Sequence, residues 1–405
     1  MKLVPLAPPF GAEGGPGKDA VATGGKTPFA TAPLARLATD TGVHSPERIG
    51  VKAARLGAAF RAGLPVLPGW VVPVGLGKSA MGAGADAIRA NGLAAERAAA
   101  LAQALDPTLA KELRSAVDGL GGRVIVRSSS PLEGDARWAG AFSSVTGVGP
   151  DNVASAVRSC WASGFAVDPL RRAEECGVGL EALELGVLVQ PEIVAEAGGV
   201  ARVEAGDVTV EGVRGHPGAL LSGWAEGVQD DELARLVGFG IVAEVGALAD
   251  RVHALLGDDL IEWAACDGEV WLLQSVRSAP DRRAEPVVPM PAHGLRVEGR
   301  PAAPGTGAGP LVACWPHETR AKDCRGAIVL VDRPVPALAP LLFGARGVIA
   351  RAGAASSHLA EVARSLGVPM VVGCRHETVT GPRPAAGAWF ATINGATGEV
   401  VLAPA

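Results

Sequence analysis

One histidine stands where the chain could hold a phosphoryl group. His358 follows Ser356 and Ser357 at the end of a run of small residues, and an apolar repeat with helical spacing begins directly after it. We therefore expect His358 in the first turn of a helix, beside backbone N–H groups that lack helical partners and near the positive end of the helix dipole. Such an environment stabilises an anion and favours a neutral imidazole, the form that can attack phosphorus. The alternative is a histidine that only makes local hydrogen bonds at the start of its helix.

A β-α-β pattern is expected to position this histidine. A short β-branched run covers residues 348–350, and a second apolar run covers residues 370–372. Between them, four residues recur at the i, i+3, i+4 and i+7 positions of one apolar helix face: Leu359, Val362, Ala363 and Leu366. Gly367 and Pro369 are then typical of a helix end.

The whole segment GAASSHLAEVARSLGVPMVVG, residues 353–373, resembles the phosphohistidine segment of a known superfamily. This is the phosphoenolpyruvate synthase, pyruvate phosphate dikinase and rifampicin phosphotransferase superfamily, whose pattern is roughly GG-x-[TS]-S-H-A-A-x-V-A-R-x-x-G-x-P-x-V-x-G. The resemblance implies that His358 is the catalytic phosphoryl carrier, with Ser356, Ser357 and Arg364 as its supporting residues. At two positions that this pattern leaves open, the family usually has an apolar residue where Glu361 stands and an acidic residue where Ser365 stands.

Two upstream segments resemble the nucleotide-binding domain of the same superfamily. In IGVKAARLGAAFRAGLPVLPGWVV, residues 49–72, the resemblance implies that Lys52 contacts the nucleotide phosphates. In RVIVRSSSPLEGDARWAGAFSSVTGV, residues 123–148, it implies that Arg127 reaches the same phosphates. The remaining ATP-binding candidates of this half are two loop residues expected to cover the phosphates and one strand residue expected near the adenine: Ser128, Gly140 and Gln190.

A hairpin further along predicts a magnesium site. Asp267 and Gly268 form a strong hairpin-turn signal between two apolar runs, so Glu262 and Gln274 are expected to lie roughly opposite one another, with a shared face of the sheet. A carboxylate beside an amide oxygen suits Mg²⁺, which proteins usually hold with one or two carboxylates and substrate phosphates. The stretch resembles the segment that closes the family's nucleotide site, which implies that Gln274 and Arg277 also contact ATP. Arg277 lies one residue late for that role, so it serves the site only if the strand ends or bulges there.

The sequence departs from the family pattern at four positions of the nucleotide site. A glutamine, a glutamate, an aspartate and an arginine of the family are replaced, respectively, by Ala141, Gly218, Leu260 and Val276. These replacements keep a second function class open, a nucleotide-binding or regulatory module with weakened catalysis.

Composition excludes several classes of protein. A net charge of −5 with scattered Lys and Arg gives no basic patch for nucleic acid. The six cysteines include no C-x-x-C pair, which suggests neither a zinc site nor a disulfide scaffold and favours reduced thiols in the cytoplasm. The longest uncharged run, residues 62–77, contains three prolines and is shorter than the ~18 to 20 residues of a membrane helix. No signal peptide is recognised. We therefore expect a cytoplasmic protein that binds neither nucleic acid nor membrane.

The predicted fold class is α/β (α+β), with an ATP-grasp domain followed by a small swivelling β/α phosphohistidine domain. A Gly/Pro-rich extension is expected at residues 1–40 and the ATP-grasp domain at 41–280, split into two lobes near 185–205. A Pro-rich linker at 281–295 and the histidine domain at 296–405 complete the prediction. One helix is expected from Ser45 to about Gly63, and one long helix from about Asp231 to Leu256.

The resemblance covers residues 49–402 and implies a dikinase-type phosphotransferase with ATP and Mg²⁺ as cofactors. Mg-ATP would give its β-phosphoryl group to His358 with release of AMP and phosphate, and the phosphohistidine would pass it to an acceptor. Because no large acceptor domain is recognised, the chain is expected to be a short form. Its acceptor would be a small molecule, presented by this chain or by a separate subunit, and its oligomeric state is left open. A third class is an ATP-grasp ligase that forms acyl-phosphates directly and releases ADP, with His358 only structural.

Overall fold

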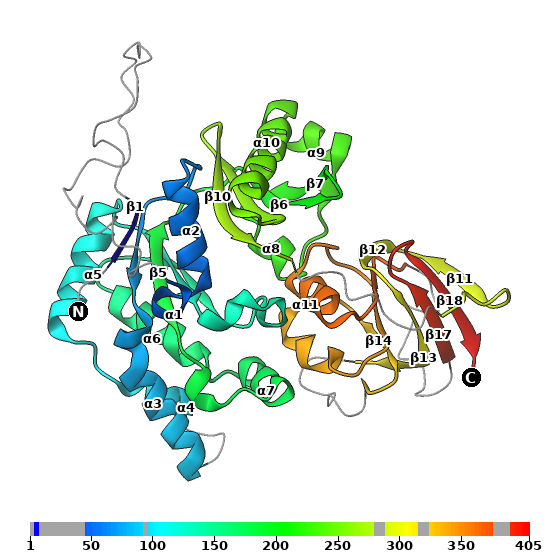
Figure 1. Cartoon of the computed structure of the whole chain (residues 1–405), viewed down its shortest axis with the longest axis horizontal. Coiled ribbons are helices and arrows are strands. Elements are labelled where there is room, and N and C mark those ends of the chain that lie inside the picture. Colours follow the sequence, from blue (N-terminus) through cyan, green and yellow to red (C-terminus); the bar gives the residue numbers. More distant parts are fainter. Residues whose placement is uncertain (1–3, 8–44, 92–95, 279–287, 315–323, 376–388) are drawn as a thin grey trace. The chain divides into compact units, whose positions relative to one another are not determined.

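The computed structural model of the chain describes residues 4–7, 45–91, 96–278, 288–314, 324–375 and 389–405. Most of the predicted extension, and residues 281–287 of the predicted linker, lie outside these ranges. The chain divides into two compact units, which are described separately (Figure 1). The first unit comprises residues 1–132, 142–166 and 180–193, and the second comprises 133–141, 167–179 and 194–405.

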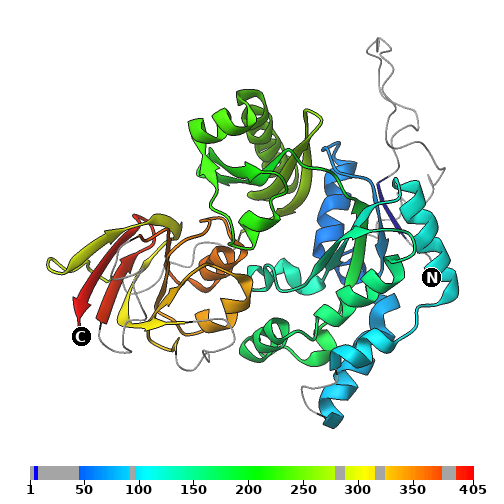
Figure 2. The ribbon, with the colours of Figure 1, turned by 180° about the vertical axis from the view of Figure 1, so that it is seen from behind.

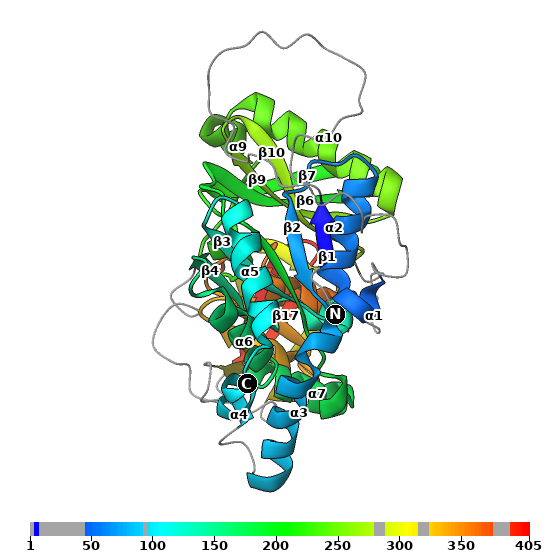
Figure 3. The same cartoon turned by 90° about the vertical axis from the view of Figure 1, so that its left-hand side faces the viewer.

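An antiparallel sheet organises the first unit. Its strands, in spatial order among the described residues, are β1 (Val4–Ala7), β2 (Gly69–Val72), β5 (Gly186–Pro191), β3 (Val124–Ser129) and β4 (Ser144–Val148). Strand β1 lies beside β2 and contacts helix α2 (Figure 3). This edge strand lies inside the stretch for which we expected an irregular extension, and Pro5 is tolerated there because an edge strand needs fewer ladder N–H groups.

The helices of the first unit begin and end at recognisable residues. They are α1 (Pro46–Ile49), α2 (Val51–Arg61), α3 (Val74–Asn91), α4 (Glu96–Ala102), α5 (Pro107–Gly119) and α6 (Val153–Ser163). Asp106 caps α5, because its carboxylate accepts the backbone N–H groups of Thr108 at 2.8 Å and Leu109 at 3.1 Å. The prediction of a single helix from Ser45 is wrong, because Gly50 interrupts the helix between α1 and α2. There the backbone adopts a φ of +78°, and a β-carbon would lie 2.0 Å from the carbonyl oxygen of Ser129.

A second antiparallel sheet forms the first part of the second unit. Its described strands are β10 (Glu269–Val276), β9 (Leu260–Cys266), β6 (Ala197–Glu204), β7 (Asp207–Arg214) and β8 (Val228–Gln229), in that spatial order. Its helices are α8 (Gly218–Leu221), α9 (Asp230–Val237) and α10 (Phe239–Leu256), and α10 packs against β6, β7, β9 and β10. The long helix expected here is two helices, because Gly238 adopts a φ of +96° between them.

A mixed sheet carries the histidine region. Its described strands, in spatial order, are β11 (Leu295–Glu298), β18 (Glu399–Pro404), β17 (Trp389–Asn394), β13 (Thr306–Ala313), β14 (Ile328–Val331), β15 (Gly347–Ala350), β16 (Met370–Val372) and β12 (Arg300–Ala303). The red strands β17 and β18 pair antiparallel, and β18 pairs with the yellow β11 (Figure 2). The pairs β13–β14, β14–β15 and β15–β16 are parallel, as a β-α-β arrangement requires.

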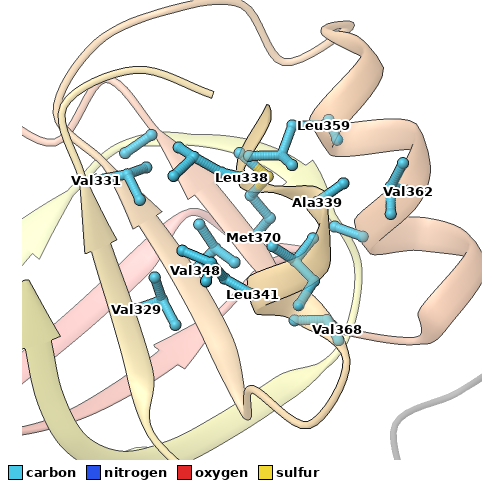
Figure 4. Packing of buried hydrophobic residues seen from close by; sticks show 14 of the residues in the cluster. Val329, Val331, Leu338, Ala339, Leu341, Val348, Leu359, Val362, Val368 and Met370 are labelled. Carbon is cyan, nitrogen blue, oxygen red and sulfur yellow. The ribbon is translucent and has the colours of Figure 1, made fainter. Parts of the chain in front are cut away.

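Helix α11 (His358–Leu366) packs on this sheet through the predicted apolar face. Leu359 and Val362 belong to a buried core cluster that also contains Leu338, Ala339 and Val348 (Figure 4). Two further described elements of the second unit lie close by. The 3-10 segment Pro336–Leu342 contacts α11, and α7 (Val167–Cys176) contacts that segment. Within the described part of the chain, no helix is both long and apolar enough to span a membrane.

Candidate functional site

His358 is the first residue of helix α11, as expected from the sequence. Ser357 is the N-cap, and its buried hydroxyl accepts the backbone N–H of Ala360 at 3.3 Å. The helix ends at Gly367, whose φ of +68° is the left-handed conformation that favours glycine. A cap hydroxyl uses only part of the N–H capacity of a helix start, so the first turn remains a favourable place for an anion.

The backbone of Gly140 approaches His358 closely within the second unit. A β-carbon on Gly140 would lie 2.7 Å from Cδ2 of His358 and 2.9 Å from its Cβ and Cγ. The φ of Gly140 is +64°, so both the conformation and the space require glycine. The resemblance had placed Gly140 on a loop over the ATP phosphates, and the structure brings this loop residue against the histidine.

The loop that carries Gly140 is held by a buried arginine that the sequence had not indicated. Arg172 on α7 is 0% exposed, and its Nη1 donates to the carbonyl oxygens of Arg137 at 2.7 Å and Ala139 at 2.9 Å. Its Nη2 also donates to the carbonyl of Pro336 at 3.1 Å. The loop before Gly140 and the 3-10 segment at 336–342 are therefore fastened to one side chain.

Asp168 balances the charge of this arginine. Its two carboxylate oxygens accept Nε of Arg172 at 2.7 Å and Nη2 at 2.8 Å, a two-point pair one helical turn apart. Burial raises the pKa of Asp168 above its ordinary value, and Arg172 opposes this rise. The i, i+4 spacing of an acid and a base on a helix was the available sequence signal, but it does not reveal burial.

We expect Gly140→Ala to impair both stability and any phosphorylation of His358. The backbone penalty for a positive φ is about 1 to 2 kcal/mol, and the added methyl group would also displace the imidazole. Gly326→Ala is the matched control, because Gly326 has a φ of +76° but nothing within 4 Å of a built β-carbon. Equal phosphorylation of the two variants, measured alongside their unfolding midpoints, would contradict a role for the Gly140 contact.

The turn before His358 is held from strands β7 and β12. Arg300 donates to the carbonyl of Gly353 at 2.8 Å and to that of Gly227 at 3.1 Å. Its Nη1 also lies 3.7 Å from the carboxylate of Glu211, which is buried. Burial raises the pKa of Glu211, and the neighbouring Ser356 and Arg300 oppose this rise. Ser356, predicted as phosphohistidine support, therefore lies beside a buried carboxyl group.

Arg364 lies elsewhere on the helix. It is in the last turn of α11, where its Nη1 is 3.4 Å from Glu204 of β6 and its Nε is 4.0 Å from Glu361. Glu361, which stands where the family usually has an apolar residue, is buried and pairs with Arg202 of β6. The structure thus places Arg364 in a charge cluster with β6 rather than at the His358 end of the helix.

The two residues predicted to bind Mg²⁺ are brought together. Glu262 on β9 and Gln274 on β10 are directly opposite in the register, next to a β-bulge between Leu272 and Gln274. Glu262 is buried, and directly opposed residues share one face of a sheet. A carboxylate and an amide oxygen are hard donors of the kind that Mg²⁺ takes, so the pair fits that ion. Among the described residues, no group of three or more His, Cys, Asp and Glu side chains has the arrangement of a metal site.

Arg277 forms a hydrogen bond with the backbone of Gly257. Strand β10 ends at Val276, and Nε of Arg277 donates to the carbonyl of Gly257 at 2.9 Å, at the end of α10. A guanidinium at this position neutralises the negative end of the helix dipole. This bond does not test the predicted contact of Arg277 with ATP.

In the first unit, the neighbouring candidates Arg127 and Ser128 lie on opposite faces of the sheet. Strand β3 pairs Ile125 with Gln190 and Arg127 with Leu188, so Arg127 and Gln190 share one face of the sheet. Ser128 points to the opposite face, is fully buried, and its hydroxyl has no hydrogen-bond partner. The side-chain amide of Gln190 donates to the carbonyl of Leu67 at 3.0 Å, a structural bond.

Lys52 lies in the first turn of α2 in the same unit. Its positive charge is near enough to Cys160 to oppose the effect of burial, which raises the pKa of that thiol to about 12. Cys160 is adjacent to β3, because its sulfur is 3.6 Å from the carbonyl of Val126. Lys52 is therefore in the neighbourhood of the strand that carries Arg127.

Two family models match parts of the chain. Residues 46–215 match the model of the pyruvate phosphate dikinase AMP/ATP-binding domain, and residues 324–398 match that of the mobile domain of PEP-utilising enzymes. The chain belongs to the phosphoenolpyruvate synthase and pyruvate phosphate dikinase superfamily. The predicted fold class, an ATP-grasp domain with a second β/α domain, is confirmed.

Two archaeal relatives show how much of a longer protein is represented. The probable phosphoenolpyruvate synthase of Methanothermobacter thermautotrophicus is 26% identical over 300 residues, which are 63% of this chain and 44% of the relative. That of Archaeoglobus fulgidus is 26% identical over 305 residues, 63% of this chain and 40% of the relative. The chain thus spans less than half the length of either relative. A solved N5-carboxyaminoimidazole synthase from Aspergillus clavatus aligns over 56% of this chain and 44% of its own, with 13% identity and a TM-score of 0.30.

Proposed function

We propose that the chain is an ATP-dependent phosphotransferase of the dikinase type, with His358 as its covalent phosphoryl carrier. The observation that carries the proposal is the approach of His358 to Gly140. It places a helix-start imidazole against the loop that the family resemblance assigns to the ATP phosphates. A histidine with only a local structural role has no need of a glycine-lined loop against its ring.

The first step would transfer the β-phosphoryl group of ATP. A nitrogen of His358 forms a bond to the β-phosphorus, the bond to the α-phosphate oxygen breaks, and AMP leaves. One water molecule takes the terminal phosphate, so ATP and water give phosphohistidine, AMP and phosphate. The positive end of α11 would stabilise the phosphoryl group on the histidine. A covalent intermediate divides one difficult transfer into two easier ones.

Cationic side chains of the first unit would prepare ATP for this step. Lys52 and Arg127 would neutralise phosphate charge, as in other phosphoryl transfers. In the second unit, Glu262 and Gln274 would hold Mg²⁺ through their oxygen atoms. When bound, Mg²⁺ would neutralise phosphate oxygens and fix their orientation. Ser128, Gly140, Gln190 and Arg277 stay ATP-binding predictions, and Ser356, Ser357 and Arg364 stay predicted supports of the phosphohistidine.

The second step would pass the phosphoryl group to an acceptor. We propose a small molecule for this role, bound by this chain or presented by another subunit. The relatives are phosphoenolpyruvate synthases by name, which suggests an acceptor with a carboxylate or enol oxygen. The predicted domain boundaries and the cytoplasmic location remain proposals.

The products of ATP test the proposal against its two rivals. Purified protein is incubated with Mg²⁺ and ATP labelled on the β-phosphate, and AMP, ADP, phosphate and protein-bound label are measured. We expect AMP and phosphate in equal amounts and label on the protein that is stable to alkali and lost in acid. Release of ADP without protein label would indicate the ligase. Nucleotide binding by calorimetry without any turnover would indicate the binding module.

We expect Glu262→Gln to raise the Mg²⁺ concentration needed for half-maximal labelling by about 100-fold. Changes even in the residues around metal ligands lower metal affinity by about 10- to 100-fold. Higher Mg²⁺ concentration should restore part of the rate. Glu269→Gln on β10 of the same hairpin is the matched control, because Glu269 is exposed and pairs with Cys266 across the turn. An unchanged Mg²⁺ titration of Glu262→Gln would exclude Glu262 as a ligand.

A further inference from the structure

Two cysteines that are separated in the sequence meet in the core of the histidine region. The sulfur atoms of Cys314 and Cys324 are 3.2 Å apart, and the two residues are 2% and 0% exposed. Both belong to the core cluster that also contains Leu359 and Val362 of α11. Their spacing has no motif character, so the sequence had suggested no pairing of these thiols.

The backbone holds both cysteines in place. The N–H of Cys314 donates to the carbonyl of Leu330 at 2.8 Å, directly after β13 has paired in parallel with β14. The carbonyl of Cys324 accepts the N–H of Ala327 at 3.2 Å, just before β14 begins. The pair therefore lies at the point where the chain leaves β13 and enters β14, fixed by the sheet on both sides.

We propose that Cys314 and Cys324 are a redox-active dithiol that a peroxide converts into a disulfide. A disulfide bond is about 2.05 Å long, so the sulfurs have to approach by only about 1.2 Å from their separation of 3.2 Å. Two thiols held in contact by a rigid framework react as if at a very high local concentration. The proposal is independent of the ATP chemistry proposed for His358.

The reaction balances with a hydroperoxide as the oxidant. One thiolate attacks an oxygen of hydrogen peroxide, the O–O bond breaks, and a sulfenic acid and hydroxide form. The second thiolate then attacks the sulfenic sulfur, the S–S bond forms and a second hydroxide leaves. The two thiol protons complete two water molecules, so two thiols and one peroxide give one disulfide and two waters.

Other cysteines of the chain are suited to serve as controls. Burial raises the pKa of Cys160 and of Cys374 to about 12, which leaves very little thiolate at neutral pH. Burial also raises the pKa of the partly exposed Cys176 and Cys266. The contact between the sulfur atoms of Cys314 and Cys324 is therefore the feature that predicts their selective reaction with one another.

Peptide mapping of the whole chain tests the proposal. The folded protein is treated with hydrogen peroxide, residual thiols are alkylated after denaturation, and the chain is digested with trypsin, which cuts after Arg320 and Lys322 between the two cysteines. We expect one cross-linked peptide pair containing Cys314 and Cys324, lighter by about 2 Da than the two thiol peptides and separated by dithiothreitol. The control variant Cys160→Ser should form the same cross-link to the same extent.

Three results would overturn the proposal. The first is full alkylation of both cysteines after peroxide treatment of the folded protein. The second is oxidation of either one to a sulfinic or sulfonic acid without the cross-link. The third is a cross-link to a different cysteine. Because the decisive measurement uses the unmodified protein, it does not depend on the folding of any variant, and Cys324→Ser serves only to confirm that the cross-linked mass is lost.

Discussion

Replacing His358 with alanine is expected to abolish the ATP-dependent labelling of the protein. The imidazole is the proposed attacking group, so without it no covalent phosphoryl intermediate can form. AMP release should fall by about 10³-fold or more, because loss of a catalytic nucleophile generally leaves only the contribution of binding and charge stabilisation. Labelling is measured with β-labelled ATP, and AMP release is followed by chromatography under single-turnover conditions.

The loss of labelling in His358→Ala must be distinguished from a loss of folding. His358 is partly exposed at a helix start, while the apolar face of α11 is formed by Leu359 and Val362, so the variant should keep its unfolding midpoint. His253→Ala is the matched control, since this exposed histidine lies in the last turn of α10. Full labelling of His358→Ala, or equal loss in the two variants, would refute the assignment.

Local patterns in the sequence predicted the parts of the site that depend on a few neighbouring residues. The helix start at His358 follows from a cap serine and an apolar repeat, and both are properties of adjacent residues. The Asp267–Gly268 turn predicted that Glu262 and Gln274 lie near one another, but the register set by the turn alone would pair Glu262 with Leu273. The β-bulge between Leu272 and Gln274 shifts the register by one residue and brings Gln274 opposite Glu262. In both cases the chemistry is set within a short stretch of chain.

Contacts between distant segments could not be predicted in this way. The break of the expected helix at Gly50 depends on the carbonyl of Ser129, which lies on another element. The meeting of Cys314 and Cys324 depends on the pairing of β13 with β14. No periodicity or composition in the sequence predicts the approach of Gly140 to His358 or the burial of Arg172.

The family pattern also left Glu361 without an explanation. An acidic residue replaces the usual apolar one on a helix that buries its neighbours, and burial of an unpaired carboxylate is costly. The structure supplies Arg202, which pairs with Glu361 and also donates to the hydroxyl of Ser278 at 2.7 Å. Arg202 of β6 therefore compensates for the acidic residue, and the sequence of the helix alone does not predict this pair.

Arg172→Met is expected to lower the free energy of unfolding by about 3 to 5 kcal/mol, the usual cost of removing one partner of a buried ion pair. The change removes the cation that is hydrogen-bonded to the Asp168 carboxylate, and it removes the Arg172 N–H groups that donate to the carbonyls of Arg137, Ala139 and Pro336. Denaturant unfolding of the whole chain measures the loss. Arg89→Met is the matched control, because Arg89 and its partner Asp86 are 55% and 79% exposed and such pairs contribute about 0 to 1 kcal/mol.

The pH dependence and a second substitution identify the cause of this loss. Because the folded-state pKa of Asp168 is raised, protonation favours the folded protein, and this contribution is lost as pH rises through the folded pKa. Without Arg172 that pKa rises further, so the destabilisation by Arg172→Met should be smaller near pH 4 than near pH 7. The double variant Arg172→Met, Asp168→Leu should recover a large part of the loss, since it removes the unpaired charge. A loss that is independent of pH and adds to that of Asp168→Leu alone would show that Arg172 acts through its carbonyl bonds and not through its charge.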